Sequence, residues 1–210
     1  MTPTEALREG VGTLGAAVPE AGIGKLLQYI ELMTKWNKTY NLTAIRDPLE
    51  MVTLHLLDSL AVLPHLPLGE RASVADIGSG GGLPGIPIAI ARPGWQVTVN
   101  DASEKKAAFL RQAAIELGLA NLSVHEGRVE AWRPAQRFSL AISRAFAELA
   151  QFAAACRHLL APDGWLAAMK GAYPRDELAA PSAPATCRVV ALKVPLLSAE
   201  RHLVLCQVAA

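Results

Sequence analysis

The sequence contains few cysteines, and they are not arranged as in a metal or redox site. The three are Cys156, Cys187 and Cys206, and no C-x-x-C pair is present. Their number is odd, and each lies in a segment whose pattern predicts a helix or a strand, which is typical of buried thiols in a reducing compartment. We therefore expect no disulfide and no zinc or other metal.

The sequence also has almost no net charge. Its 20 Lys and Arg residues against 19 Asp and Glu residues give a formal charge of +1, which excludes the globally basic surface of many nucleic-acid-binding proteins. The charges are unevenly spread, because residues 1–70 carry five basic and eight acidic side chains, whereas residues 71–170 carry eleven and eight. Any attraction for a polyanion must therefore be local.

Long hydrophobic runs are missing as well. The densest, Leu83 to Ala91, is far shorter than the roughly 18 to 20 residues of a membrane span. The first ten residues lack the basic and then apolar segments of a secretory signal. We expect a soluble, cytoplasmic protein without membrane association, and the 51% of hydrophobic residues suffice for one compact domain.

Apolar residues recur at helical spacing in residues 22–40 and 48–66, and Asp47 followed by Pro48 is a typical helix start. We expect residues 1–70 to form an N-terminal helical cap packed on the same domain as the rest of the chain.

From residue 71 onward, short strand patterns alternate with helical patterns. Strands are expected at 73–78, 95–101, 122–127, 138–145 and 165–171, with helices at 85–91, 104–117 and 146–160. This alternation predicts an α/β fold in which residues 71–210 form a Rossmann-like, mostly parallel, doubly wound sheet. Residues 187–197 and 202–209, joined by the turn 198–201, are expected to end it as an antiparallel hairpin, and residues 172–186 to form a mobile loop.

The first strand is followed by Asp76 to Gly85, which read DIGSGGGLPG. Glycines let backbone N–H groups approach a ligand, and the next helix adds its positive N-terminal dipole. We interpret the segment as a nucleotide-type binding turn that includes Gly80. A P-loop is excluded because G-K-[ST] is missing, and the alternative is a tight turn without a ligand.

Two acidic residues favour S-adenosylmethionine as the ligand. Asp76 beside the turn would repel the pyrophosphate of a dinucleotide but attract the amino group and sulfonium of adenosylmethionine. Asp101 ends the next strand, where an acceptor for both ribose hydroxyls belongs, although it could instead cap the helix near Glu104. An NAD(P)-dependent oxidoreductase that uses the G-x-G-x-x-G pattern of residues 80–85 is the alternative enzyme.

Val129 and Glu130 follow the third strand, at the edge where the adenine would lie. We expect Val129 to pack on the base and Glu130 to accept a hydrogen bond. The alternative is a solvated charged turn.

The end of the fourth strand lacks the N/D-P-P-Y element with which amino-group methyltransferases hold an exocyclic amine, because residues 142–146 read ISRAF. A purine ring nitrogen owns an in-plane lone pair and needs only alignment with the methyl group. Arg144 is then a candidate positioning residue for phosphate or guanine acceptors, unless it forms a structural salt bridge. His55, with Asp58 three residues later, and Trp36 are expected to be packed residues.

Seven strings occur in order along the chain: WNKxYNLT (36–43), HxLDS (55–59), DIGSGGGLPGIP (76–87), KKxxFL (105–110), ISRAF (142–146), KG (170–171) and ERHL (200–203). Together they closely resemble the bacterial RsmG family, also called glucose-inhibited division protein B. The resemblance implies an adenosylmethionine-dependent enzyme that forms 7-methylguanosine in the decoding region of 16S ribosomal RNA. By motif position it implies cofactor contacts at Gly78, Leu83, Val129, Glu130 and Arg144.

With an RNA substrate implied, the basic residues predicted near the carboxyl edge of the sheet become candidate RNA contacts: Arg128, Arg144, Lys170 and Arg201. Because the bulk charge is low, we expect weak binding to free RNA. The expected partner is 16S RNA within the small ribosomal subunit or an assembly intermediate, bound by a monomer. A ribosome-assembly factor that retains the cofactor fold without catalysis is the other alternative.

Overall fold

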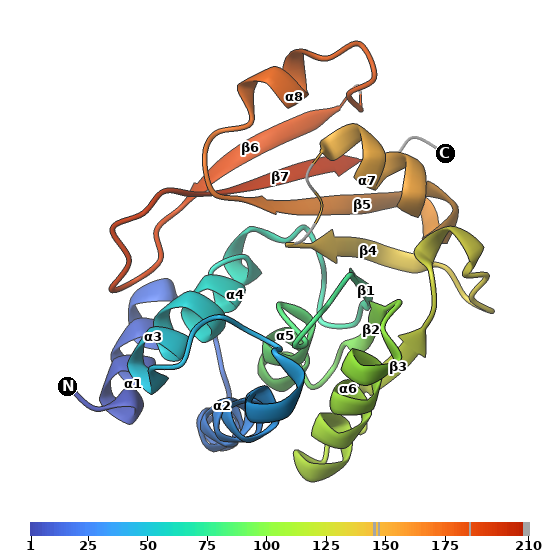
Figure 1. Ribbon diagram of the computed structural model, residues 1–210. Helices are drawn as coiled ribbons and strands as arrows, with labels where there is room; N and C mark the ends of the chain where they lie inside the picture. The colour runs from blue at the N-terminus through green and yellow to red at the C-terminus, as the bar shows by residue number, and fades with distance from the viewer. Residues whose placement is uncertain (145, 147, 185, 208–210) are drawn as a thin grey trace.

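A computed structural model of the chain describes residues 1–144, 146, 148–184 and 186–207. Within these residues seven strands form one sheet in the order β3-β2-β1-β4-β5-β7-β6, with helices on both sides (Figure 1). The strands are β1 (Ser73–Ile77), β2 (Gln96–Asp101), β3 (Leu122–Glu126), β4 (Phe138–Ser143), β5 (Leu160–Lys170), β6 (Cys187–Leu192) and β7 (Arg201–Gln207).

The sheet is parallel from β3 to β5, and β7 then pairs antiparallel with both β5 and β6. The predicted mostly parallel, doubly wound sheet that ends in an antiparallel hairpin is therefore confirmed. The strand order reverses between β1 and β4, and ligands of open α/β sheets bind at the carboxyl ends of the strands beside such a switch point. The segments that follow β1, β2 and β4 are thus the place to look for a site.

On the central strands, alternate residues enter different core clusters, because side chains of a strand point to opposite faces. On β1, Val74 packs in the larger cluster and Ala75 in the smaller one. The larger cluster joins one face of the sheet to the helices that precede β1 and to two later helices: α1 (Pro3–Leu14), α2 (Glu20–Tyr40), α3 (Pro48–Met51), α4 (Asp58–Leu60), α5 (Gly85–Ala91) and α6 (Glu104–Glu116). The smaller cluster holds α7 (Leu149–Cys156) on the other face.

The helices before β1 follow their capping signals. Asp47 accepts hydrogen bonds from the N–H groups of Leu49 and Glu50, as expected of an N-cap. Helix α1, which the periodicity analysis did not include, carries a capping box in which Thr2 and Glu5 bond reciprocally. The predicted helix 48–66 is not uniform, since it comprises α3, a π-helical segment η1 (Val52–Leu57), α4 and a final 3-10 turn at Leu63–His65.

Several predicted boundaries are wrong. Helix α7 is shorter than residues 146–160, and β5 begins at Leu160 rather than at 165, because a register shift lets Leu160 pair with Phe138. The hairpin connection is 193–200, longer than 198–201, and it contains Pro195, which lacks a ladder N–H. The expected loop 172–186 contains helix α8 (Arg175–Ala179). Four parts of these predictions lie outside the described residues. They are the predicted strand ends at 145 and at 208–209, residue 147 of the predicted helix and residue 185 of the expected loop.

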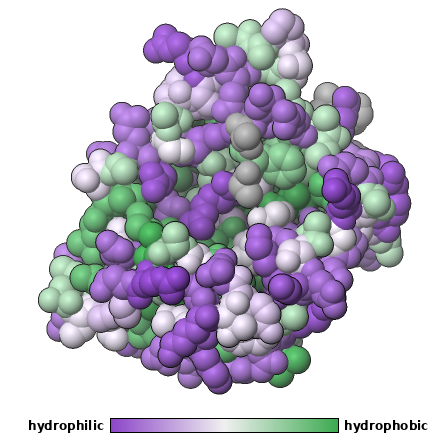
Figure 2. Space-filling view, viewed as in Figure 1, coloured by the Kyte–Doolittle hydropathy of each residue, from purple (hydrophilic) through white to green (hydrophobic). Residues whose placement is uncertain are grey.

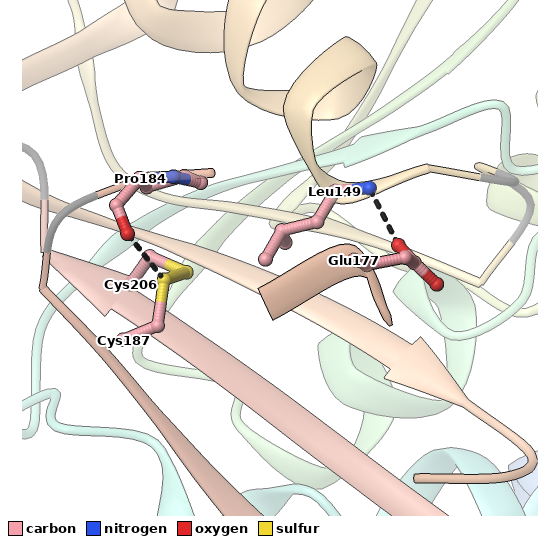
Figure 3. Close-up of a disulfide and its surroundings, with 5 residues drawn as sticks. All are labelled: Leu149, Glu177, Pro184, Cys187 and Cys206. Carbon is pink, nitrogen blue, oxygen red and sulfur yellow. Dashed lines mark hydrogen bonds between the residues drawn. A yellow bond between two sulfur atoms is a disulfide. The ribbon is translucent and has the colours of Figure 1, made fainter. Parts of the chain in front are cut away.

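The expectation of no disulfide is also wrong, because Cys187 of β6 and Cys206 of β7 are bonded (Figure 3). The antiparallel register sets these two residues directly opposite each other, with Cα atoms 4.0 Å apart, which is close enough for a bridge. Spacing along the sequence does not reveal this register. Cys156 is free and buried as expected, and burial raises the pKa of its thiol to about 12.

The surface mixes hydrophilic and hydrophobic residues on the face seen in Figure 2. Across the described part of the chain, every helix is too short or too polar to cross a membrane.

The bridge closes a loop between residues 19 positions apart and should restrict the unfolded chain. We expect reduction of the oxidised protein to lower its free energy of unfolding by about 2–4 kcal/mol, measured by denaturant titration with and without dithiothreitol. Cys187→Ser should remove this difference and Cys156→Ser should retain it. Titration of three free thiols in the denatured, unreduced protein would contradict the bridge.

Candidate active site

The glycine turn after β1 contains glycines with two different tasks. Gly78 and Gly80 have φ angles of 67° and 58°, a region that side chains disfavour, and a Cβ on Gly80 would meet nothing closer than 4.0 Å. Gly82, which also has a positive φ of 93°, and Gly85 are packing positions, since a Cβ would collide with Ile86 in the first case and lie 2.7 Å from Asp76 Oδ2 in the second. The open space of the turn is therefore at Gly80.

Helix α2 packs against the glycine turn that follows β1. The hydroxyl of the fully buried Tyr29 donates to the carbonyl oxygen of Gly81, and Met33 of the same helix lies against Gly81. Burial raises the pKa of Tyr29 well above its ordinary value, so this phenol stays a donor. The sequence analysis missed Tyr29, because no local motif marks a contact across 52 positions.

Asp76 lies fully buried at the start of the turn. Its Oδ2 accepts from the N–H of Gly85 at 2.8 Å, while its Oδ1 has no hydrogen-bond partner among the described residues. Burial raises the pKa of Asp76 to about 6, against the opposing effects of neighbouring donors and of Arg144. A buried acceptor without a partner is costly, and a bound ammonium group would satisfy it.

Asp101 lies at the end of β2, next to the turn. Its Oδ2 accepts from the N–H of Gly80 and its Oδ1 from the N–H of Ser103, both at 2.9 Å. Asp101 is not the cap of the following helix, because the N-cap of α6 is Ser103. The two backbone hydrogen bonds use one lone pair of each carboxylate oxygen. The carboxylate keeps lone pairs for two ribose hydroxyls.

The other predicted cofactor contacts lie around the same edge. Val129 is almost fully buried and packs in the smaller core cluster with Ile77, whereas Glu130 is exposed and its carbonyl accepts from Arg133. Leu83 packs in the larger cluster, and its N–H donates to Ser79.

Arg144 forms the ion pair that was considered as its alternative role, and it does so at the edge of a pocket. Its Nη1 lies 3.2 Å from Asp58 Oδ2 and donates to the Leu54 carbonyl at 3.0 Å. Arg201 Nε donates to the other oxygen of Asp58 at 2.9 Å. Asp58, with only 3% of its side chain exposed, therefore holds two arginines that the chain separates by more than fifty residues.

The sequence analysis noted Asp58 only as a neighbour of His55, and its actual role was missed. His55 is buried and bonds through Nε2 to Thr43 Oγ1, which confirms the packed role expected of it. Burial and Arg144 lower the pKa of His55 to about 4, so the ring is neutral near pH 7. Trp36 is half-buried and packs edge-on against Phe109.

A pocket of about 310 Å³ opens at the carboxyl ends of β4 and β5. Its polar lining brings together three of the four candidate RNA contacts, namely Arg144, Lys170 and Arg201, with Asp58 and His202. Arg128 is exposed in the segment after β3 and does not line this pocket. Lys170 is mostly buried and paired with Glu177 at 2.8 Å.

The residues present fit adenosylmethionine. The Asp76 oxygen that has no partner among the described residues suits its amino group, the open space at Gly80 admits the part of the cofactor that lies against the backbone, and Asp101 suits its ribose. The parallel sheet with its switch point and this site together define an adenosylmethionine-dependent methyltransferase of the Rossmann-like class.

Solved structures show the same fold. A ribosomal protein L11 methylase from Lactobacillus delbrueckii subsp. bulgaricus matches 72% of this chain and 76% of its own, with a TM-score of 0.54 and 18% identity. The C-terminal domain of precorrin-6Y C5,15-methyltransferase from Rhodobacter capsulatus matches 71% and 88%, with a TM-score of 0.54 and 14% identity. Because their sequence identities to this chain are so low, these two structures support only the assignment of the fold.

Residues 22–204 match the model of the family described as rRNA small subunit methyltransferase G. Relatives of that name are 52% identical in Burkholderia thailandensis, over 94% of this chain and 88% of the relative, and 50% identical in Burkholderia cenocepacia, over 94% and 89%. The chain belongs to the rRNA small subunit methyltransferase G family. This membership favours the methyltransferase over the oxidoreductase alternative.

The pKa of Asp76 makes cofactor binding depend on pH. The folded apo-protein protonates this carboxyl below about pH 6, and only the ionised form attracts an ammonium group. We expect the affinity for adenosylmethionine to rise about tenfold between pH 5 and pH 7, measured by calorimetric titration. Asp76→Asn should bind more weakly and without this pH dependence, and a wild-type affinity that is flat over the same range would contradict the assignment.

The Asp58 carboxylate should also stabilise the fold. Asp58→Asn removes the charge that faces Arg144 and Arg201, but both arginines are a quarter to a third exposed, so water compensates part of the loss. We expect the free energy of unfolding to fall by about 1–3 kcal/mol in denaturant titration. The control Asp163→Asn, at an exposed residue with φ 59° that Asn tolerates, should change it little; equal effects of the two variants would refute the role.

Proposed function

We propose that this protein transfers the methyl group of adenosylmethionine to N7 of one guanine in the decoding region of small-subunit ribosomal RNA. The observation that carries the proposal is the composition of the pocket beside Arg144. Its polar side chains are mainly hydrogen-bond donors, and the carboxylate oxygens of Asp58 are both taken by arginines. Such a pocket suits acceptors, and the major-groove edge of guanine presents the acceptors O6 and N7.

Among the described residues, the end of β4 carries no Asn or Asp side chain to accept from an exocyclic amine. Ser143, whose hydroxyl donates to the Ile77 carbonyl at 2.7 Å, is followed by the cation Arg144. A ring nitrogen needs no base, because its lone pair attacks directly. The arginines must leave N7 free, so we assign them to O6 and to phosphates rather than to N7 itself.

Catalysis then consists mainly of alignment. Adenosylmethionine supplies, when bound, a methyl group on a positively charged sulfur. Asp76 would hold its amino group, Asp101 would hold the ribose, and the glycine turn would admit the part of the cofactor between them. Arg144, which lines the pocket, would fix the guanine so that its N7 faces the cofactor. Arg201 and Lys170 contribute charge toward the RNA backbone.

The substrate is proposed to be presented by the small ribosomal subunit or an assembly intermediate, in the cytoplasm, to a monomeric enzyme. The formal charge of +1 and the pairing of the pocket's basic residues with Asp58 and Glu177 leave little free positive surface for naked RNA. The shape of a ribosomal particle and contacts with its proteins would supply the binding free energy that the low positive charge of this protein cannot provide.

The test is methyl transfer to naked 16S RNA, assembly intermediates and complete subunits, all prepared from cells that lack this protein. We expect transfer to a particle, with 7-methylguanosine detected by borohydride–aniline cleavage. Asp101→Ala should lower the affinity for adenosylmethionine about tenfold or more, because two ribose hydrogen bonds are lost.

An unchanged cleavage pattern at every guanine would reject the target. Complementation of the missing protein by an Asp101→Ala variant that folds but cannot bind adenosylmethionine would favour the non-enzymatic assembly factor instead. Binding of adenosylmethionine that is equal in both proteins would reject the ribose assignment.

A further inference from the structure

Glu177 occupies a place that an anion of the substrate would fit. Its Oε2 accepts from the Nζ of Lys170 at 2.8 Å and from the N–H of Leu149, the first residue of α7, at 2.7 Å. Figure 3 shows the Glu177 carboxylate directed at that N–H group from α8. Lys170 also donates to the Phe146 carbonyl at 3.2 Å.

Lys170 belongs to the pocket assigned above to the substrate. It ends β5, pairs in register with His202 of β7, and lines the pocket together with Arg144 and Arg201. Only 10% of its side chain is exposed, so its ammonium group needs an anionic partner. In the free protein that partner is Glu177.

Few residues anchor the segment that carries Glu177. No residue of α8 is fully buried; its core contacts are the buried Pro174, which precedes the helix, and the partly buried Leu178, which packs on the smaller core cluster. A second side-chain contact of this segment goes to the pocket lining, where the half-exposed Tyr173 meets the ring of His202 edge-on at 5.6 Å. Elements with little buried surface open at low cost in free energy. Both contacts hold residues 173–177 against the pocket.

We propose that a phosphate of the substrate RNA replaces the Glu177 carboxylate at Lys170 and at the Leu149 N–H. A phosphodiester carries one negative charge and accepting oxygens, as a carboxylate does, so Lys170 remains paired throughout the exchange while Glu177 returns to water with α8. Glu177 thereby weakens RNA binding and favours RNA that presents a phosphate at this position. This inference rests on the proposed ribosomal RNA substrate.

The test compares two neutralising changes on the same helix. Glu177→Gln keeps an acceptor for Leu149 but leaves Lys170 without its counter-charge, whereas Asp176→Asn changes net charge equally at an exposed neighbour. We expect Glu177→Gln to bind the small-subunit substrate about 3- to 10-fold more tightly, with a salt dependence steeper by about one counterion. Asp176→Asn should change the affinity less than twofold.

A double-mutant cycle assigns the effect to Lys170. In a Lys170→Gln background, Glu177→Gln should give no further gain in affinity, because the partner is missing. Thermal unfolding of each variant confirms that it is folded. Equal affinities of Glu177→Gln and wild type, or equal gains in Glu177→Gln and Asp176→Asn, would overturn the proposal, and so would a gain that persists without Lys170.

The two proposals fail separately. If wild-type protein transfers no methyl group to any ribosomal substrate, the proposed function fails. If wild type transfers it and Glu177→Gln binds no better, the function stands and the replacement of Glu177 by phosphate is wrong.

Discussion

The hydrogen bond from the Gly85 N–H to the buried Asp76 carboxylate joins the end of β1 to the start of α5, and the rest of the site is arranged around it. It sets the length of the glycine turn, and it requires that residue 85 have no side chain, because a Cβ would press on Asp76 and on Val99. The second Asp76 oxygen is buried and has no hydrogen-bond partner in the described part of the chain. Burial of this acceptor without a hydrogen bond costs free energy in the unliganded protein, and a cationic ligand group bound there would offset that cost.

The helices before β1 serve this turn as much as they cover the sheet. Tyr29 and Met33 of α2 contact Gly81, and the segment that follows α2 is held by Asn37, which donates to and accepts from the backbone of Thr43. The π-helical segment η1 turns the Leu54 carbonyl and, just after it, Asp58 toward Arg144. π-Helical segments are frequent at functional sites, and here the segment joins the helices to the end of β4.

Basic side chains at the carboxyl edge of the sheet are matched by acidic ones from helices outside the sheet. Asp58 faces Arg144 and Arg201, and Glu177 faces Lys170. This pairing explains how a chain with a formal charge of +1 can still concentrate cations at one pocket. It also keeps these cations ordered and partly neutralised before a polyanion arrives, which limits non-specific attraction.

Local patterns in the sequence determined the strand and helix alternation, the glycine turn, Asp76 and Asp101, because periodicity, capping and turn chemistry act over a few neighbouring residues. Only the tertiary structure decided what meets across long separations. The bridge between Cys187 and Cys206 depends on the register of two strands. Of the two arginines on Asp58, Arg144 directly follows β4 and Arg201 begins β7. The pairing of Lys170 with Glu177 depends on a short helix inside an apparent loop. Such contacts depend on how the elements pack and on the register of the strands. The local sequence patterns used to place the elements do not specify which of these residues will meet.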